Sequence, residues 1–179
     1  MALGSTVFTF EIDLADADRG VYESLALRVA RHPSESDEFL VARVLAYCLE
    51  YTDGIDFSRG LSEADEPPVL VRDLTGAVQA WIDVGTPAAE RLHKASKAIR
   101  RVVVYVHKPA QQWLASLGAA RIHRAEQIEL RLVDPALVAG LVARLDRRIS
   151  FALTVSDGEL FAAFSDATLT GNLRRRTIE

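Results

Sequence analysis

Apolar and polar residues alternate along residues 5–14 and again along residues 22–31. A period of two places every second side chain on the same face of an extended chain, so each stretch predicts a half-buried strand. In the first stretch the apolar positions are Phe8, Phe10, Ile12 and Leu14. The polar segment 15–20 suits a turn, and the two strands are expected to pair as an antiparallel hairpin.

After Pro33 the pattern takes on the period of a helix. Either Ser34 or Ser36 can accept a hydrogen bond from the first free backbone amides, and the helix is predicted to run to about Tyr51. Its apolar stripe contains Val41, Ala42, Leu45, Cys48 and Leu49. This stripe predicts that one face of the helix packs on the core.

Three strands are predicted in the next part of the chain, a short one near 55–58 and longer ones at 69–73 and 77–85. The apolar residues of the 77–85 strand occupy both faces, which is typical of a central strand. A turn near 74–76 joins the two longer strands. The loop at 59–66 is rich in acidic residues and, by itself, suits a solvated segment.

A helix is predicted from Thr86, as its cap, to about Ile99, with Pro87 in its first position. The continuous apolar run 101–107 follows and predicts a buried strand. Because it comes after a strand and a helix, it is expected to lie parallel to the 77–85 strand through a right-handed crossover.

The last third of the chain predicts two more helices, over 109–117 and 135–145, with a strand at 127–133 between them. A hairpin is expected at 150–165 around the dipeptide Asp157-Gly158, and a final strand at 168–173. The basic segment 174–176 is predicted to be a frayed, solvated terminus. The whole chain, residues 1–179, is predicted to be one domain of mixed α and β structure.

Composition and charge argue against several classes of protein. The net charge of −4 argues against bulk electrostatic binding of nucleic acid, although it leaves room for a local basic groove. With one cysteine, Cys48, the chain can form neither an internal disulfide nor a cysteine zinc cage. No apolar run has the length of a membrane span and no signal peptide pattern is present, so the predicted location is the cytoplasm.

Asp83 raises the main question about function, which is what compensates its charge. Asp83 stands in the motif WIDVG, at the end of an otherwise apolar strand, and a buried carboxylate is costly unless it is paired, hydrogen-bonded or bound to a metal. Other acids could converge on it: Glu38 from the first helix, and Asp65 or Glu66 from the loop. Oxygen ligands of this kind suit Mg²⁺ or Mn²⁺.

Two of these residues have an alternative interpretation. Glu38 lies at the centre of the apolar stripe and could point inward, but it also lies in the first helical turn, where a solvated acid favours the helix dipole. Lys94 could reach back toward Asp83 and stabilise negative charge on a phosphate. By periodicity alone, Lys94 belongs to a solvated helix face.

The order helix, strand, strand, helix, strand, with acids on the first three and a lysine on the fourth, resembles the PD-(D/E)XK nuclease superfamily. The motifs ARHPSE at 30–35, FSRGLSEADEP at 57–67, WIDVG at 81–85 and the pair Arg91 and Lys94 resemble the YaeQ family, a divergent branch of it. The resemblance implies an α+β fold: a restriction-endonuclease-like αβββαβ core with a central mixed sheet at 33–107. An N-terminal β-hairpin within 1–32 and a β-rich part within 108–179 would be additions to that core.

The resemblance also implies roles for residues. Glu38, Asp83 and Lys94 would be catalytic, and Glu38, Asp83, Glu66 and Asp65 would hold Mg²⁺ or Mn²⁺ in a metal-dependent nuclease or phosphodiesterase. Two positions depart from the superfamily pattern: Gly85 stands where the strand lysine would be, and Pro68 where family members carry an acid. Asp73 is a further substitute for that acid.

Four basic residues complete the set of candidates. Arg31, His32, Arg59 and Arg91 would contact the phosphates of a substrate, and nucleic acid is the expected partner. For Arg31, His32 and Arg59, hydrogen bonds that fix the loops are an equally open interpretation. The alternative function is a catalytically inactive relative that keeps the fold and the cleft and binds a protein or a nucleic acid.

Overall fold

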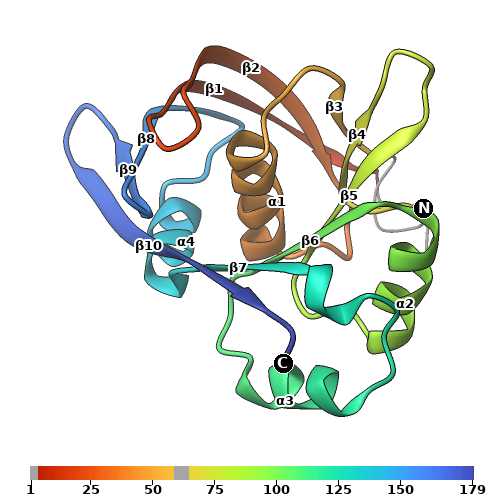
Figure 1. Ribbon diagram of the computed structural model, residues 1–179. Helices are drawn as coiled ribbons and strands as arrows, with labels where there is room; N and C mark the ends of the chain where they lie inside the picture. Colours follow the sequence, from red (N-terminus) through yellow and green to blue (C-terminus); the bar gives the residue numbers. More distant parts are fainter. Residues whose placement is uncertain (1–3, 59–64) are drawn as a thin grey trace.

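The computed structural model describes residues 4–58 and 65–179. Within these residues ten strands form one mixed sheet in the order β2-β1-β8-β9-β10-β7-β6-β5-β4-β3, accompanied by four α-helices and one short 3₁₀ helix (Figure 1). The strands are β1 (Thr6–Asp16), β2 (Val21–Arg31), β3 (Ile55–Phe57), β4 (Val69–Arg72), β5 (Val78–Val84), β6 (Arg101–Val106), β7 (Glu129–Val133), β8 (Arg148–Ser156), β9 (Glu159–Ala163) and β10 (Thr168–Thr177). The helices are α1 (Asp37–Leu49), α2 (Ala89–Ala98), α3 (Gln111–Ala119) and α4 (Pro135–Ala143), and the 3₁₀ helix is η1 (Ala125–Gln127).

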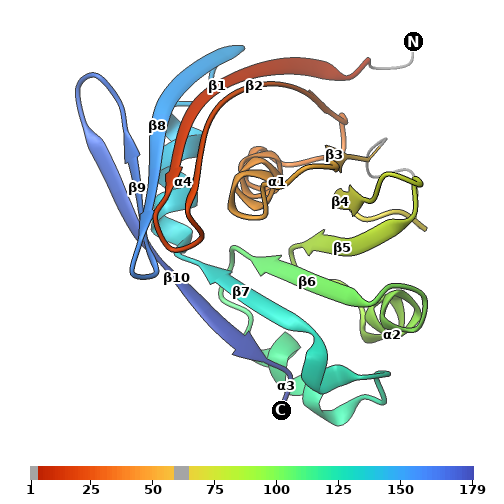
Figure 2. The same cartoon turned by 45° about the horizontal axis from the view of Figure 1, so that its top comes forward.

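The sheet curls around α1, with α4 beside it, while α2 and α3 cover the outer face of the β5–β7 part (Figure 2). Nine of the thirteen residues of α1 are buried. A helix that is apolar on almost all sides has to be enclosed, which is why the predicted single stripe understates its burial. The main core lies between α1, α4 and the inner face of the sheet, and a second core lies between the outer face and helices α2 and α3.

The strand predictions are confirmed in their pairing as well as their positions. β1 and β2 form an antiparallel hairpin in continuous register from Thr6 opposite Arg31 to Asp16 opposite Val21. β5 and β6 are parallel, as the crossover predicts. The turn between β8 and β9 has positive φ at both Asp157 and Gly158, the conformation that this dipeptide favours in two-residue hairpins.

Three neighbouring strands determine where a ligand can bind. β5, β6 and β7 are parallel, so their carboxyl ends meet at one edge of the sheet, and α2, α3 and α4 begin just beyond that edge. In sheets of this kind, ligands bind in crevices outside the carboxyl ends of the strands. Side chains along β5 alternate: Ile82 and Val84 face α1, whereas Trp81 belongs to the outer core beside α2.

Two local predictions were wrong. Arg174, Arg175 and Arg176 lie within β10, which pairs antiparallel with β7, because the backbone of β7 offers hydrogen bonds that a solvated terminus would not have. The cap of α2 is Ala88 rather than Thr86, and the Ala88 side chain accepts no hydrogen bond from the first amides of that helix.

The architecture is a mixed α+β fold with a large mixed sheet and, in the described residues, four α-helices. Strands from residues 1–32 and 108–179 join the same sheet as those from 33–107, through the pairs β1–β8 and β6–β7. No helix in the described part of the chain is long and apolar enough to cross a membrane.

Candidate functional site: a polar cleft at the ends of β5 and β6

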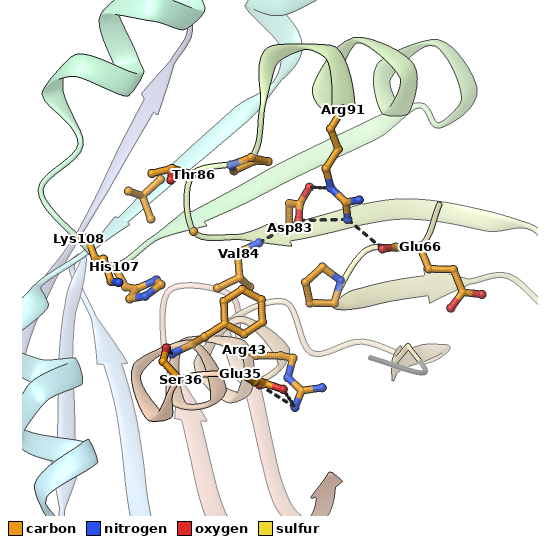
Figure 3. A pocket seen from close by; sticks show the side chains of 15 residues that line it. Glu35, Ser36, Arg43, Glu66, Asp83, Val84, Thr86, Arg91, His107 and Lys108 are labelled. Atoms are coloured by element: carbon orange, nitrogen blue, oxygen red, sulfur yellow. Dashed lines mark hydrogen bonds and ion pairs between the residues drawn. The ribbon is translucent and has the colours of Figure 1, made fainter. Parts of the chain in front are cut away.

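A cleft of about 370 Å³ opens at the carboxyl ends of β5 and β6, between the starts of α1 and α2 (Figure 3). Its lining combines polar and apolar side chains: Glu35, Ser36, Phe39, Arg43, Glu66, Pro68, Asp83, Val84, Gly85, Thr86, Pro87, Arg91, Val106, His107 and Lys108. Two acid–arginine pairs lie in it, Asp83 with Arg91 and Glu35 with Arg43.

Asp83 is buried, with 3% of its surface exposed, and both of its carboxylate oxygens accept hydrogen bonds. Oδ2 accepts from Arg91 Nε at 2.8 Å and from Trp81 Nε1 at 3.1 Å, and Oδ1 accepts from the Val84 amide at 3.3 Å. The ion pair and these neutral donors answer the requirement that a buried carboxylate be compensated. The compensating charge comes from Arg91.

Arg91 lies in the first turn of α2 and connects three parts of the site. Its Nη2 donates to the Glu66 carbonyl at 2.9 Å, and its guanidinium lies 5.0 Å from the centre of the Trp81 ring. The planar guanidinium can make all these contacts at once, which a lysine ammonium cannot. Arg91 therefore joins the start of α2 to the end of β5 and to the segment before β4.

The second pair, Glu35 with Arg43, is more deeply buried, with side-chain exposures of 1% and 3%. Arg43 Nη2 lies 3.0 Å from Glu35 Oε2 and also donates to the carbonyl of Ala30 at 2.9 Å. Burial raises the pKa of Glu35, although the charge of Arg43 and the His32 amide oppose that shift. Burial lowers the pKa of Arg43 for the same reason. This pair fixes the start of α1 against the end of β2.

His107 follows the last residue of β6, is 4% exposed and lines the cleft. Neither of its ring nitrogens has a hydrogen-bond partner among the described residues. Burial lowers the pKa of His107, the neighbouring Lys108 charge lowers it further, and Glu38 opposes the shift. The ring is thus held toward its neutral form, with one donor and one acceptor that no described residue engages.

The lowered pKa of His107 predicts a pH-dependent stability. Below its ordinary value of 6.5, the unfolded chain binds more protons than the folded one, so stability falls as the pH falls through that region. We expect His107→Gln to lessen this loss, as measured by urea unfolding at a series of pH values. Equal pH dependence in both proteins would contradict the assignment.

The acids predicted to surround Asp83 do not gather there. Glu38 and Asp65 are exposed, and neither lines the cleft. Glu66 lines the cleft, but its side chain extends away from Asp83 in Figure 3, and its contact with Arg91 is through the backbone carbonyl. Lys94 is 75% exposed and pairs with Glu90 at 3.5 Å, so it occupies the solvated face that periodicity indicates.

The predicted phosphate-binding residues are also dispersed. Arg31 pairs with Asp37 at the start of α1 and lies over the ring of Phe8, outside the cleft lining. His32 makes hydrogen bonds within the segment between β2 and α1: its amide donates to the Glu35 carboxylate, and its ring contacts the Ser34 hydroxyl. Arg59 lies outside the described residues. Of the three that the structure describes, only Arg91 lines the cleft, where it contacts Asp83.

These positions do not fit a divalent metal ion. Among residues 4–58 and 65–179, no group of three or more His, Cys, Asp or Glu side chains is close enough to hold one. Mg²⁺ prefers octahedral oxygen coordination, and Asp83, the one predicted ligand that is both buried and in the cleft, is already bound by a guanidinium. The metal therefore stays a prediction that this arrangement does not support.

Sequence reasoning missed four charged or titratable residues of the cleft: Glu35, Arg43, His107 and Lys108. The signal for the pair was an arginine inside the apolar run LVARVLAYCL, because a charge in such a run has to be paired. The acid that pairs with it is Glu35, three residues before the predicted Glu38. The signal for His107 was a histidine at the end of a buried parallel strand.

Comparisons with known proteins agree with one another. A family model described as YaeQ protein matches residues 1–172. An uncharacterized YaeQ protein of Escherichia coli K12 is 30% identical over 176 residues, which cover 97% of this chain and 96% of that protein. The crystal structure of YaeQ protein from Pseudomonas syringae has a TM-score of 0.90 and 33% identity, covering 98% of this chain and 97% of the other. The YaeQ protein from Xanthomonas axonopodis pv. citri has a TM-score of 0.86 at 33% identity, covering 98% and 99%.

Proposed function

The chain belongs to the YaeQ family. We propose that its cleft binds one nucleotide of a nucleic acid and that this binding needs no metal ion. The observation that carries this proposal is the pair of Asp83 and Arg91. The carboxylate that a nuclease would offer to a metal ion is neutralised by an arginine of the chain itself. The cleft remains open, and the described residues around it assemble no metal centre.

The lining of the cleft suits a flat heterocyclic base. Its walls are partly apolar, from Phe39, Val84 and Pro87, and polar side chains lie between these apolar parts. The neutral ring of His107 can bond to a base edge, and Lys108 beside it offers a positive charge to a phosphate. Small-molecule sites typically combine such apolar walls with a few placed polar groups.

A metal-dependent nuclease or phosphodiesterase is the second candidate. The element order α1–β3–β4–β5–α2–β6 is the αβββαβ order that the resemblance to the PD-(D/E)XK superfamily implies. Asp83 is the last residue but one of its third strand, β5. For this function Arg91 would have to release Asp83, and an acid from outside the cleft would have to move in. The departures at Gly85 and Pro68 add to that requirement.

Metal dependence separates the two functions. We expect a fluorescently labelled single-stranded oligonucleotide to bind with the same affinity in EDTA and in millimolar Mn²⁺, to remain uncleaved, and to bind less tightly to His107→Ala. Calorimetric titration of the protein with Mn²⁺ alone should give no binding heat.

Lys94→Ala is the matched control, because Lys94 lies outside the cleft but would be catalytic in a nuclease. Binding by this variant should equal that of the wild type. Mn²⁺-dependent cleavage that disappears in Lys94→Ala and in Asp83→Asn would overturn the binding function in favour of the nuclease.

A further inference from the structure

We infer that a second hollow, next to the cleft, binds the phosphates of a nucleic-acid strand through Lys108, Arg174 and Arg176. The hollow has a volume of about 430 Å³ and lies at the carboxyl ends of β6 and β7, between the start of α3, the start of α4 and β10. The ligand, a nucleic-acid strand, is taken from the proposed function. The residues that would bind its phosphates differ from those proposed to bind its base.

The cations of this hollow come from two separate segments of the chain. Lys108 follows β6, and Arg174 and Arg176 lie two positions apart on β10, so they share one face of that strand. Both arginines are exposed, and within the described residues no hydrogen bond or ion pair engages any of the three side chains. Two residues of a strand span about 6–7 Å, so the two arginines present charges in a row.

The acid in the hollow is already engaged. Asp134 caps α4, and its Oδ1 accepts from the Ala136 amide at 2.9 Å. Three cations therefore face one carboxylate that has a structural partner, which leaves the hollow positive. The amino-terminal ends of α3 and α4 add their partial positive charge on the same side.

The opposite face of β10 provides the contrast. Arg175 points into another hollow, whose lining includes Asp16, Asp18, Glu50 and Glu129 along with several arginines. There the charges pair: Arg101 contacts Glu50 at 2.8 Å, and Arg131 contacts Glu129. The excess of positive charge is thus confined to the face of β10 that bears Arg174 and Arg176.

The two hollows adjoin each other. Val106 and Lys108 line both the cleft with His107 and the hollow with Arg174 and Arg176. A strand that places a base in the cleft can therefore extend its phosphates across Lys108 toward β10. Because an unstacked base has to enter the cleft, the ligand class is single-stranded nucleic acid rather than a duplex.

The test is a salt titration of binding, measured by fluorescence anisotropy with a labelled oligothymidylate. Each phosphate contact to a single strand contributes about 0.7 to the slope of log K against log salt concentration. We expect Arg174→Ala and Arg176→Ala each to lower that slope by about 0.7, and the double variant by about twice as much. Arg175→Ala removes the same charge from the same strand and should leave the slope unchanged.

A second measurement covers the case in which a variant is unstable or the oligonucleotide does not bind. Inorganic pyrophosphate added to ¹⁵N-labelled wild-type protein should shift the Nε signals of Arg174 and Arg176 and the Ala136 amide, but not the Nε signal of Arg175. If the oligonucleotide binds and all three arginine variants behave alike, the hollow is not a phosphate site, although the cleft still binds. If the wild type binds no oligonucleotide, the proposed function fails, and the hollow then stands or falls with the pyrophosphate shifts.

Discussion

Replacing Arg43 with methionine is expected to lower the free energy of unfolding by about 3–5 kcal/mol, the range observed when one partner of a buried ion pair is removed. The side chains of Arg43 and Glu35 are 3% and 1% exposed, so water cannot take the place of the lost guanidinium. Methionine fills a similar volume, and the loss then reports the unpaired carboxylate rather than a cavity. Urea unfolding at neutral pH measures it.

The double variant Glu35→Gln/Arg43→Met is the control, and it should recover most of the loss because no buried charge remains. The raised pKa of Glu35 also predicts that the stability of the wild type depends on pH. Since burial raises the pKa of Glu35 above its ordinary 4.5, the folded state binds more protons than the unfolded state just above that pH, and stability falls as the pH rises through this region. Glu35→Gln should remove this fall. A loss below about 1 kcal/mol for Arg43→Met would show that the pair is accessible to water.

The elements of the fold were largely predictable because their residues follow local rules. Alternation located β1 and β2, a serine cap and an apolar stripe located α1, and the Asp157-Gly158 turn located the last hairpin. The strand nature of 174–176 was not predictable from the segment itself. Three arginines in a row have no apolar pattern, and their strand conformation comes from hydrogen bonds to β7, which is distant in sequence.

At the site, the sequence predicted that Asp83 needs a compensating group, but it did not identify Arg91 as the residue that supplies it. Asp83 required compensation, and it is compensated. Lys94 was the cation considered for it, yet α2 runs away from the carboxyl end of β5, so each further residue of the helix moves about 1.5 Å along its axis. Only the first turn, with Arg91, lies beside Asp83. Such a distinction depends on the direction of a helix relative to a strand end, which periodicity does not give.

Replacing Arg91 with methionine is the second large effect that we expect, a loss of about 3 kcal/mol, the lower part of the range for buried pairs. The value is at the lower end because the Arg91 side chain is 26% exposed, which lets water approach Asp83 in the variant. Asp83→Asn/Arg91→Met should be more stable than Arg91→Met at neutral pH, and Arg91→Lys should lie between the wild type and Arg91→Met.

The same variant also tests whether Asp83 can serve a metal. Without Arg91, the carboxylate is released from its guanidinium but stays at the end of β5, so a site that only needed Arg91 to move would now bind a divalent ion. A ligand that binds only the folded state raises its stability by mass action, and millimolar Mn²⁺ would then restore the melting temperature of Arg91→Met. We expect no such recovery, because in the described residues no other two acidic or histidine side chains stand close enough to Asp83 to complete a metal site. A rise in melting temperature with Mn²⁺ that Asp83→Asn abolishes would instead show that Arg91 masks a metal centre, and the nuclease would become the better supported function.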